Sequence, residues 1–270
     1  YQWQKDGVAI EGATEAFYAT APLGPEDDGS VYRVIVSHPA VAESLTSDPA
    51  AATVIASFDA ALIGHWAFDE GEGDVATDSA GNHPGQIVDA TYIEGQVGSH
   101  ALEFNGTSAH VNVGATGTEL ELTDTSYTIA WWQRWNGTGG SQRPVNMDDA
   151  GDFSGGYSFN IIDGKLTWTH IGGGGTENWV VPDFTASTDW QHIAAVYDGS
   201  ERMLYVDGQF VGALETTIDL VTDGDDPLLF GAVDAPCCGG LIQFFNGALD
   251  DIRIYDYALK AGEVAWLVEG

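Results

Sequence analysis

The chain has 270 residues, enough for one large β domain or for a medium domain with a smaller companion. Hydrophobic residues make up 44% of the sequence, which excludes a disordered chain. Its 41 acidic and 8 basic residues give a formal charge of −33, which argues against nucleic-acid and anionic-membrane partners, and no run of about 18 apolar residues predicts membrane insertion.

Residues 1–57 predict a small β unit and a linker. Residues 1–8 alternate and meet an Asp-Gly turn, and residues 32–36 form a second β-branched run. These segments resemble the second half of a bacterial immunoglobulin-like domain, with Trp3 as the core tryptophan and Tyr32 as the corner tyrosine. The resemblance implies that the preceding strands belong to a longer chain or are donated by another molecule through β-augmentation.

Residues 58–270 predict strands joined by tight turns. Two hairpins are expected across Asp163-Gly164 and Asp207-Gly208, because Asp-Gly favours two-residue hairpin turns. Many strands without intervening helices indicate an all-β, two-sheet antiparallel sandwich, with helical spacing only at 258–268. Further strands are expected at residues 65–68, 101–104, 109–113, 127–135, 178–181, 191–197, 228–230 and 247–255.

Several phrases of this second region occur in the order typical of one family. They are residues 65–73, 78–82, 95–98, 101–106, 127–132, 190–194, 205–208 and 245–255. Together they resemble the laminin G-like, concanavalin A-type jelly-roll family. The resemblance implies a jelly roll whose first and last strands lie side by side, and a role in recognition, commonly of glycans or proteins.

Tryptophans mark the expected core of the sandwich. Alternation along residues 127–135 places Trp131 and Trp132 on opposite faces of one central strand. Trp66, Trp131 and Trp190 are expected to pack in the core, because aromatic side chains of this size dominate sandwich cores.

Carboxylates near both ends of this region predict a structural calcium ion. Calcium prefers six to eight oxygen ligands from carboxylates, amides and carbonyls. If the first and last strands adjoin, Asp69 or Asp78 meets Asp250 or Asp251. The alternative is that these aspartates cap turns and accept backbone N–H bonds.

Three long loops, at residues 136–155, 171–177 and 231–243, predict a binding rim. Aromatic rings stack on sugars while polar side chains bond hydroxyl groups, so the rim favours glycans. The alternative is that the loops are merely solvated. The candidate ligand-binding residues are Trp135, Arg143, Asp148, Asp149, Asp152 and Trp179.

Catalysis is not expected. Retaining glycosidases need two carboxyl groups about 5.5 Å apart on a rigid support. Glu70, Glu72 and Asp74 have the alternation of such sites, but the intervening glycines favour a turn. The adjacent Cys237 and Cys238 leave open a vicinal disulfide or two thiols.

The sequence therefore predicts a non-catalytic, extracellular recognition or adhesion module of a larger secreted or cell-surface protein. It is expected to bind a glycan or an extracellular protein and to contain calcium. One alternative is a subunit of an extracellular filament or surface layer, which self-associates through the incomplete N-terminal domain. A polysaccharide hydrolase or lyase is a further alternative.

Overall fold

The computed structural model divides the chain into two compact units, Tyr1–Phe58 and Asp59–Gly270. Each unit is described by itself below. The described residues are 1–20, 23, 27, 29–41, 43–52, 58–114, 116–123, 126–148, 155–172, 175–216, 218, 220, 221, 224 and 226–269.

The first unit is an antiparallel sheet with strand order β2-β1-β3-β4, in which β5 also pairs with β3. Its strands are β1 (Gln2–Lys5), β2 (Val8–Ala9), β3 (Val31–Val36), β4 (Leu45–Thr46) and β5 (Ala50–Ala51). Among its described residues only Ala13 and Ser30 are buried, and Trp3 and Tyr32 are half-buried. Trp3 lies 6.1 Å from the ring of Tyr18. The immunoglobulin-like resemblance therefore stays a prediction.

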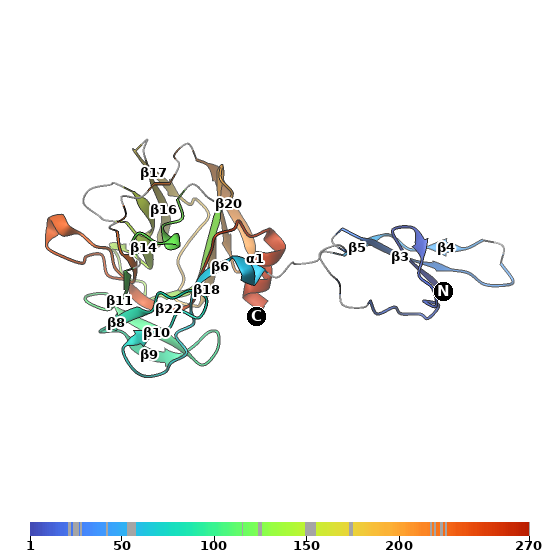
Figure 1. Cartoon of the computed structure of the whole chain (residues 1–270), viewed down its shortest axis with the longest axis horizontal. Coiled ribbons are helices and arrows are strands. Elements are labelled where there is room, and N and C mark those ends of the chain that lie inside the picture. Colours follow the sequence, from blue (N-terminus) through green and yellow to red (C-terminus); the bar gives the residue numbers. More distant parts are fainter. Residues whose placement is uncertain are drawn as a thin grey trace. The chain divides into compact units, whose positions relative to one another are not determined.

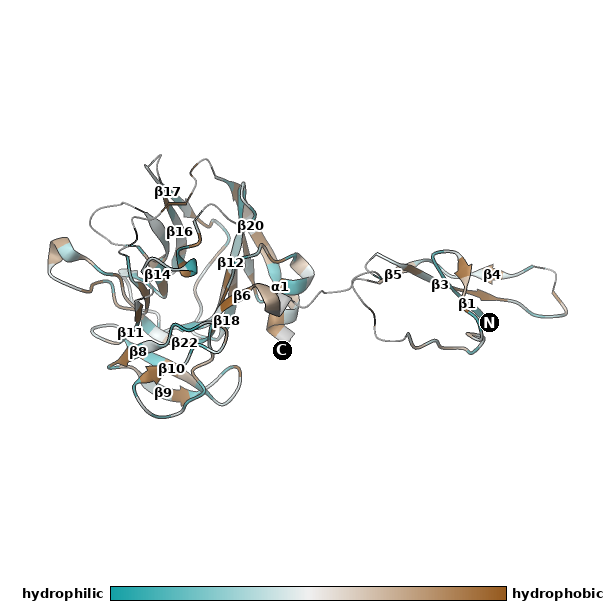
Figure 2. Ribbon diagram, in the orientation of Figure 1, coloured by the Kyte–Doolittle hydropathy of each residue, from teal (hydrophilic) through white to brown (hydrophobic). Residues whose placement is uncertain are grey.

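The second unit contains an eight-stranded antiparallel sheet with order β20-β19-β18-β12-β22-β10-β9, in which β6 also pairs with β22 (Figure 1). The strands are β6 (Leu62–Trp66), β9 (Thr91–Glu94), β10 (His100–Asn105), β12 (Tyr127–Trp135), β18 (Gln191–Tyr197), β19 (Glu201–Val206), β20 (Gln209–Glu215) and β22 (Asn246–Tyr255). Figure 2 shows hydrophobic stretches on β6, β9 and β10 beside more hydrophilic loops.

A nine-stranded antiparallel sheet has the order β17-β16-β15-β14-β21-β11-β8-β7, with β13 paired to β15. Its strands are β7 (Val75–Ala76), β8 (Gly85–Val88), β11 (His110–Gly114), β13 (Ser141–Gln142), β14 (Val145–Met147), β15 (Gly156–Ile162), β16 (Lys165–Gly172), β17 (Gly175–Val180) and β21 (Leu228–Phe230). The two sheets form the expected all-β, concanavalin A-like jelly-roll sandwich.

Both predicted Asp-Gly hairpins form. Asp163 and Gly164 have φ of 49° and 81°, and Asp207 and Gly208 have φ of 49° and 73°. The two-residue type I′ turn matches the twist of the flanking strands and requires positive φ at both central residues. This requirement favours Asp or Asn followed by Gly. The turns set the registers of β15 with β16 and of β19 with β20.

The first and last strands of the sandwich pair, as expected. In β6 and β22, Trp66 lies opposite Ile252 and His65 opposite Arg253. The same strand β22 also pairs with β10 and β12. One strand therefore joins segments from the beginning, middle and end of the unit.

The core lies between the two sheets. Trp66 and Trp131 are fully buried, and Trp131 of β12 packs 4.9 Å from Phe159 of the facing sheet. Trp190 differs from the expectation, because it is only half-buried and the guanidinium of Arg134 lies 5.4 Å from its ring. Trp190 directly precedes β18. Its indole packs against the guanidinium of Arg134 at the rim of the sheet.

Arg202 of β19 is fully buried. It donates hydrogen bonds to a carboxylate oxygen of Glu177 at 2.7 Å and to the carbonyl of Trp168 at 3.0 Å. Its guanidinium also lies 5.7 Å from the ring of Trp168. A buried charge is tolerated only when it is paired and hydrogen-bonded, so these partners are what allow a cation in the core.

The expected C-terminal helical segment is α1 (Ala261–Glu269), which buries Val264 and Leu267. The 3-10 helices whose bounds lie within the described residues are η2 (Phe58–Ala61), η3 (Glu119–Glu121) and η4 (Pro236–Cys238). Among the described residues, no helix has both the length and the apolar character needed to cross a membrane.

Replacing Trp131 with alanine should lower the free energy of unfolding by about 3–5 kcal/mol, because the substitution opens a large cavity in the core. Chemical denaturation followed by circular dichroism measures this loss. Val180→Ala is the control, because Val180 is 55% exposed and should change stability by less than about 0.5 kcal/mol. Equal effects of the two substitutions would show that Trp131 does not pack as described.

Candidate functional site

A polar groove with a volume of about 540 Å³ lies at one end of the second unit. Three segments form it: the β10–β11 turn, the loop that follows β12, and the segment before β22. The lining residues are Asn105, Gly106, Thr107, Thr138, Gly139, Ser141, Gln142, Gln243, Phe244 and Asn246. The groove thus presents amide and hydroxyl groups together with one aromatic ring.

Strand register brings these segments together. Asn105, the last residue of β10, lies opposite Asn246, the first residue of β22. Trp135, the last residue of β12, lies opposite Gly247 on the other side of β22. Because all three strands end at the same edge of the sheet, the segments beyond them converge there.

The groove wall is fixed by hydrogen bonds among its own polar groups. Gln142 donates to the carbonyl of Thr138 at 2.9 Å and to its hydroxyl at 2.8 Å, while its side-chain oxygen accepts the backbone N–H of Asn246 at 3.0 Å. Asn105 Oδ1 accepts the backbone N–H of Thr107 at 2.9 Å, which closes the β10–β11 turn. Such a wall is preorganised, so little side-chain freedom remains to be lost on binding.

Phe244 supplies the aromatic ring of the groove and is half-buried. Its neighbour Phe245 is fully buried in the core. The sequence reasoning did not identify Phe244, although a usable signal exists. Successive side chains of an extended segment point to opposite sides, so when one of two adjacent phenylalanines enters the core the other faces outward.

Arg143 lies behind the groove wall and connects it to the nine-stranded sheet. Its Nε donates to Gln243 Oε1 at 2.8 Å, and its Nη1 donates to Asn146 Oδ1 at 3.2 Å and to the hydroxyl of Ser158. Asp148 Oδ2 lies 3.5 Å from Nη1. Arg143 and Asp148 were predicted to contact a ligand; the structure places both in this largely buried network, where they support Gln243.

The polar network continues across the outer face of the nine-stranded sheet. Asn146, Ser158, Thr169 and Asn178 are successive cross-strand neighbours on β14, β15, β16 and β17. Ser158 donates to Asn146 at 2.5 Å and Thr169 donates to Asn178 at 2.7 Å. These paired side chains hold the register of the strands that support the groove.

The other predicted ligand residues lie elsewhere. Trp179 is only 6% exposed and packs 6.0 Å from Trp168, so its ring belongs to the core. Trp135 is half-buried and packs against the turn at Gly164. Asp149 and Asp152 lie outside the described residues.

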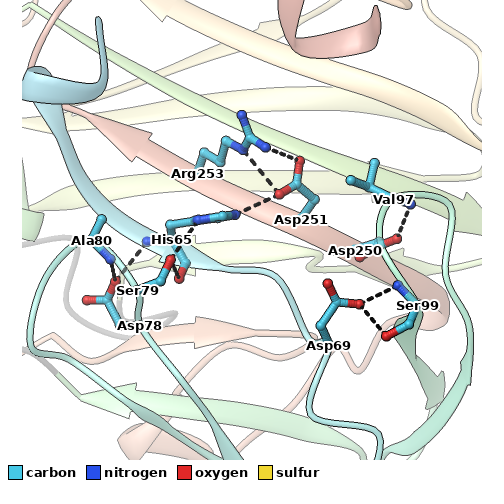
Figure 3. A network of polar contacts seen from close by, with 10 residues as sticks. All are labelled: His65, Asp69, Asp78, Ser79, Ala80, Val97, Ser99, Asp250, Asp251 and Arg253. Carbon is cyan, nitrogen blue, oxygen red and sulfur yellow. Dashed lines mark hydrogen bonds and ion pairs between the residues drawn. The ribbon is translucent and has the colours of Figure 1, made fainter. Parts of the chain in front are cut away.

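Figure 3 shows the carboxylates that were predicted to bind calcium. Asp69 Oδ1 accepts the N–H and the hydroxyl of Ser99 at 2.5 and 2.9 Å. Asp78 Oδ1 accepts the N–H groups of His65, Ala80 and Gly81 at 2.9–3.1 Å. Both aspartates therefore act as turn caps, the alternative role considered for them.

The remaining two carboxylates sit at a bulge in β22. One residue, Trp131 of β12, faces two residues of β22, Asp251 and Ile252. Asp251 has φ of 47°. The bulge absorbs an extra residue, so that Leu249 and Ile252 both reach the core while Asp250 and Asp251 stay outside it.

Asp251 is held by two side chains, His65 and Arg253. His65 Nε2 lies 2.7 Å from its Oδ1, and Arg253 contacts both of its oxygens at 3.1 Å (Figure 3). Burial raises the pKa of Asp251, but the hydrogen bond from His65 and the charge of Arg253 outweigh burial and hold the pKa below its usual value.

Asp250 is in the opposite electrostatic situation. Its Oδ2 accepts the N–H groups of Gln96 and Val97 at 2.8 and 2.9 Å, while its Oδ1 is buried and has no hydrogen-bond partner within the described part of the chain. Burial, reinforced by the charge of Asp251, raises the pKa of Asp250 to about 7.

Each of these four carboxylates accepts hydrogen bonds from protein groups. Calcium requires six to eight oxygens, whereas Asp69, Asp78 and Asp251 already accept protein donors. Among the residues with described positions, no three His, Cys, Asp or Glu side chains are arranged to share a metal ion. Bound calcium therefore stays a prediction.

Ser79, His65 and Asp251 are linked in a chain of hydrogen bonds. Ser79 Oγ lies 2.8 Å from His65 Nδ1, and His65 Nε2 lies 2.7 Å from Asp251 Oδ1 (Figure 3). The adjacent N–H groups of Ala80 and Gly81 donate to Asp78. They are therefore not directed toward a position where an oxyanion next to Ser79 would form.

Comparison with known proteins identifies the kind of fold. A family model described as the concanavalin A-like lectin/glucanases superfamily matches residues 105–265. No curated protein has a matching sequence.

Solved structures share the fold at low sequence identity. The binding domain of Paraclostridial Mosquitocidal Protein 1 has a TM-score of 0.61 and 19% identity, over 78% of this chain and 52% of that one. Domain 4 of AbnA, a GH43 extracellular arabinanase from Geobacillus stearothermophilus, has a TM-score of 0.58 and 20% identity, over 77% and 98%. The binding domain of botulinum neurotoxin DC has a TM-score of 0.60 and 12% identity, over 79% and 52%.

The present chain thus spans about half the length of the mosquitocidal-protein and neurotoxin binding domains, at 52% each. It spans nearly all of the arabinanase domain, at 98%. At these identities the likeness shows the fold alone.

Asp250→Asn should change how stability depends on pH. The folded-state pKa of Asp250, about 7, lies above its usual value of 3.8, so the wild type loses stability as pH rises between these two values. Asparagine is neutral throughout and retains an oxygen for the two N–H groups. The variant should therefore gain about 2 kcal/mol over the wild type from about pH 4 to about pH 8, after allowance for solvent screening.

Urea denaturation at a series of pH values measures this difference. Asp256→Asn is the matched control, because Asp256 is exposed at the end of β22. Parallel pH profiles for the wild type and Asp250→Asn would contradict the raised pKa.

Proposed function

The chain belongs to the concanavalin A-like lectin/glucanases superfamily, and we propose that its second unit is a non-catalytic module that binds neutral glycans in the polar groove. The groove carries the proposal. Its amides and hydroxyls can donate hydrogen bonds to sugar hydroxyls and accept hydrogen bonds from them. Phe244 offers a face to the C–H side of a sugar ring.

The size and rigidity of the groove support this proposal. Its volume of about 540 Å³ falls in the range of about 300–1,000 Å³ that is typical of ligand sites. Gln142 and Asn105 are held by hydrogen bonds to the protein, so the lining is preorganised.

The comparisons also support a binding role. The arabinanase domain, which this chain matches over 98% of its length, was solved in complex with arabinotriose, and the botulinum neurotoxin DC binding domain was solved in complex with SialylT. Both are domains of larger proteins, and each of these domains shares the fold of this unit. We extend glycan binding to this chain on the chemistry of its own groove.

Two arrangements that resemble catalytic sites are used for structure instead. Glu70 accepts the backbone N–H of Thr77 at 2.7 Å and contacts the hydroxyl of Tyr92 at 3.4 Å, in the turn after β6. In the chain from Ser79 to Asp251, the N–H groups beside Ser79 are bonded to Asp78. These uses favour binding over hydrolysis.

The proposal includes a cellular context. We place the chain outside the cell, as part of a larger secreted or surface protein, with the first unit as part of an immunoglobulin-like domain. The support is the alternation and Asp-Gly turn of the first unit, its antiparallel sheet, and the extracellular arabinanase among the similar structures.

Phe244→Ala tests the groove directly. The substitution should weaken binding to the best neutral polysaccharide about tenfold, or about 1.4 kcal/mol, because it removes the stacking face. Affinity electrophoresis against a panel that includes arabinan, followed by calorimetry, measures the change. Phe210→Ala is the control, since Phe210 is 58% exposed on β20 and does not line the groove.

Two outcomes would overturn the proposal. The first is retention of the wild-type affinity by Phe244→Ala, which would place the ligand elsewhere. The second is an absence of binding across the whole panel.

Added calcium tests the metal prediction separately. A structural ion that uses Asp250 should raise the melting temperature of the wild type, and this rise should be reversed by a chelator and absent in Asp250→Asn. Differential scanning calorimetry measures the effect. An unchanged melting temperature with calcium in excess would remove the predicted ion without affecting the glycan proposal.

A further inference from the structure

Two adjacent thiols lie at the tip of the loop between β21 and β22. Cys237 and Cys238 are the only cysteines of the chain, and both are exposed. Their Sγ atoms lie 3.0 Å apart. Each sulfur is therefore accessible to a reagent and within reach of the other.

The loop holds this pair in a defined position. Val233 and Ile242 form an antiparallel bridge at its base, with backbone hydrogen bonds of 3.2 and 3.0 Å. Near the tip, the N–H of Cys238 donates to the carbonyl of Ala235 at 2.8 Å within η4. A Cβ added at Gly239 would contact nothing within 4 Å, so the space beside the thiols is open.

The covalent geometry predicts a reducible disulfide. Adjacent Cα atoms are about 3.8 Å apart, whereas disulfide-bonded cysteines usually have Cα atoms about 4.4–6.8 Å apart. Closing the ring between neighbours therefore introduces strain, and strained, exposed disulfides have more oxidising potentials than structural ones.

A disulfide between neighbours also contributes little to folding. Disulfides stabilise chiefly by closing a loop in the unfolded chain, and the gain grows with the length of that loop. A bond between Cys237 and Cys238 encloses no intervening residue. A role in stabilising the fold is therefore disfavoured for such a bond.

We propose that Cys237 and Cys238 form a redox-active vicinal dithiol, a modification site that closes reversibly to a disulfide by exchange with a small-molecule disulfide such as oxidised glutathione. The thiolate of one cysteine attacks the external disulfide, forms a mixed disulfide and releases one external thiolate. The second protein thiolate then attacks the protein sulfur of the mixed disulfide and releases the other external thiolate. The two protein thiols are oxidised, the external disulfide is reduced to two thiols, and the two protons pass to the released thiolates.

The test is a redox titration of the whole chain in glutathione buffers, with rapid acid quenching, alkylation and mass spectrometry. The wild type should show two main species, one with both thiols alkylated and one with neither. Cys237→Ser and Cys238→Ser should instead accumulate a mixed disulfide with glutathione, because each lacks the second thiol that would resolve it. Serine is close in size to cysteine and both positions are exposed, so the variants should remain folded, as circular dichroism will verify.

Accumulation of the mixed disulfide by the wild type to the level of the single variants would overturn the proposal, as would disulfide-linked dimers as the main product. A second readout separates a redox site from a structural cross-link. The oxidised and reduced wild type should have melting temperatures within about 2 °C of each other. A larger drop on reduction would also overturn the proposal.

Discussion

The pairing of β22 with three other strands is the constraint on which the second unit depends. β6 and β10 lie along one side of β22 and β12 lies along the other, so that segments from the start, middle and end of the unit share one strand. This register sets the ends of β10, β12 and β22 at a common edge. The turn after Asn105, the loop after Trp135 and the segment around Phe244 meet there and form the groove. The site is therefore a product of long-range pairing, and no segment of the chain contains it alone.

Much of the scaffold follows from local sequence. Alternation along residues 127–135 and 191–197 predicts β12 and β18, and the Asp-Gly dipeptides predict the two hairpins, because these signals depend on near neighbours only. The family resemblance supplied the adjacency of the first and last strands. Short strands such as β13 and β14 were not predicted, since two or three residues carry too little periodicity to detect.

The site was harder to predict because side-chain partners depend on register. Trp179 looked like a sugar-stacking residue beside a loop, but β17 begins at Gly175 and turns its indole toward the core. Asp250 and Asp251 looked like a pair of metal ligands. A bulge, which sequence alone does not reveal, gives them different neighbours, and their pKa values consequently shift in opposite directions. The loop predicted at residues 136–155 supplies part of the groove lining, through Thr138, Gly139, Ser141 and Gln142.

The ion pairs of the interior also shape the exterior. Arg143, Arg202 and Arg253, out of only 8 basic residues against 41 acidic ones, are largely withdrawn from solvent beside their own carboxylate partners. The surface is left with few positive charges, and its field is dominated by carboxylates out to roughly one Debye length, about 8 Å at physiological ionic strength. A net charge of −33 slows the approach of a polyanion and leaves the approach of an uncharged polymer unaffected, and high salt weakens this difference.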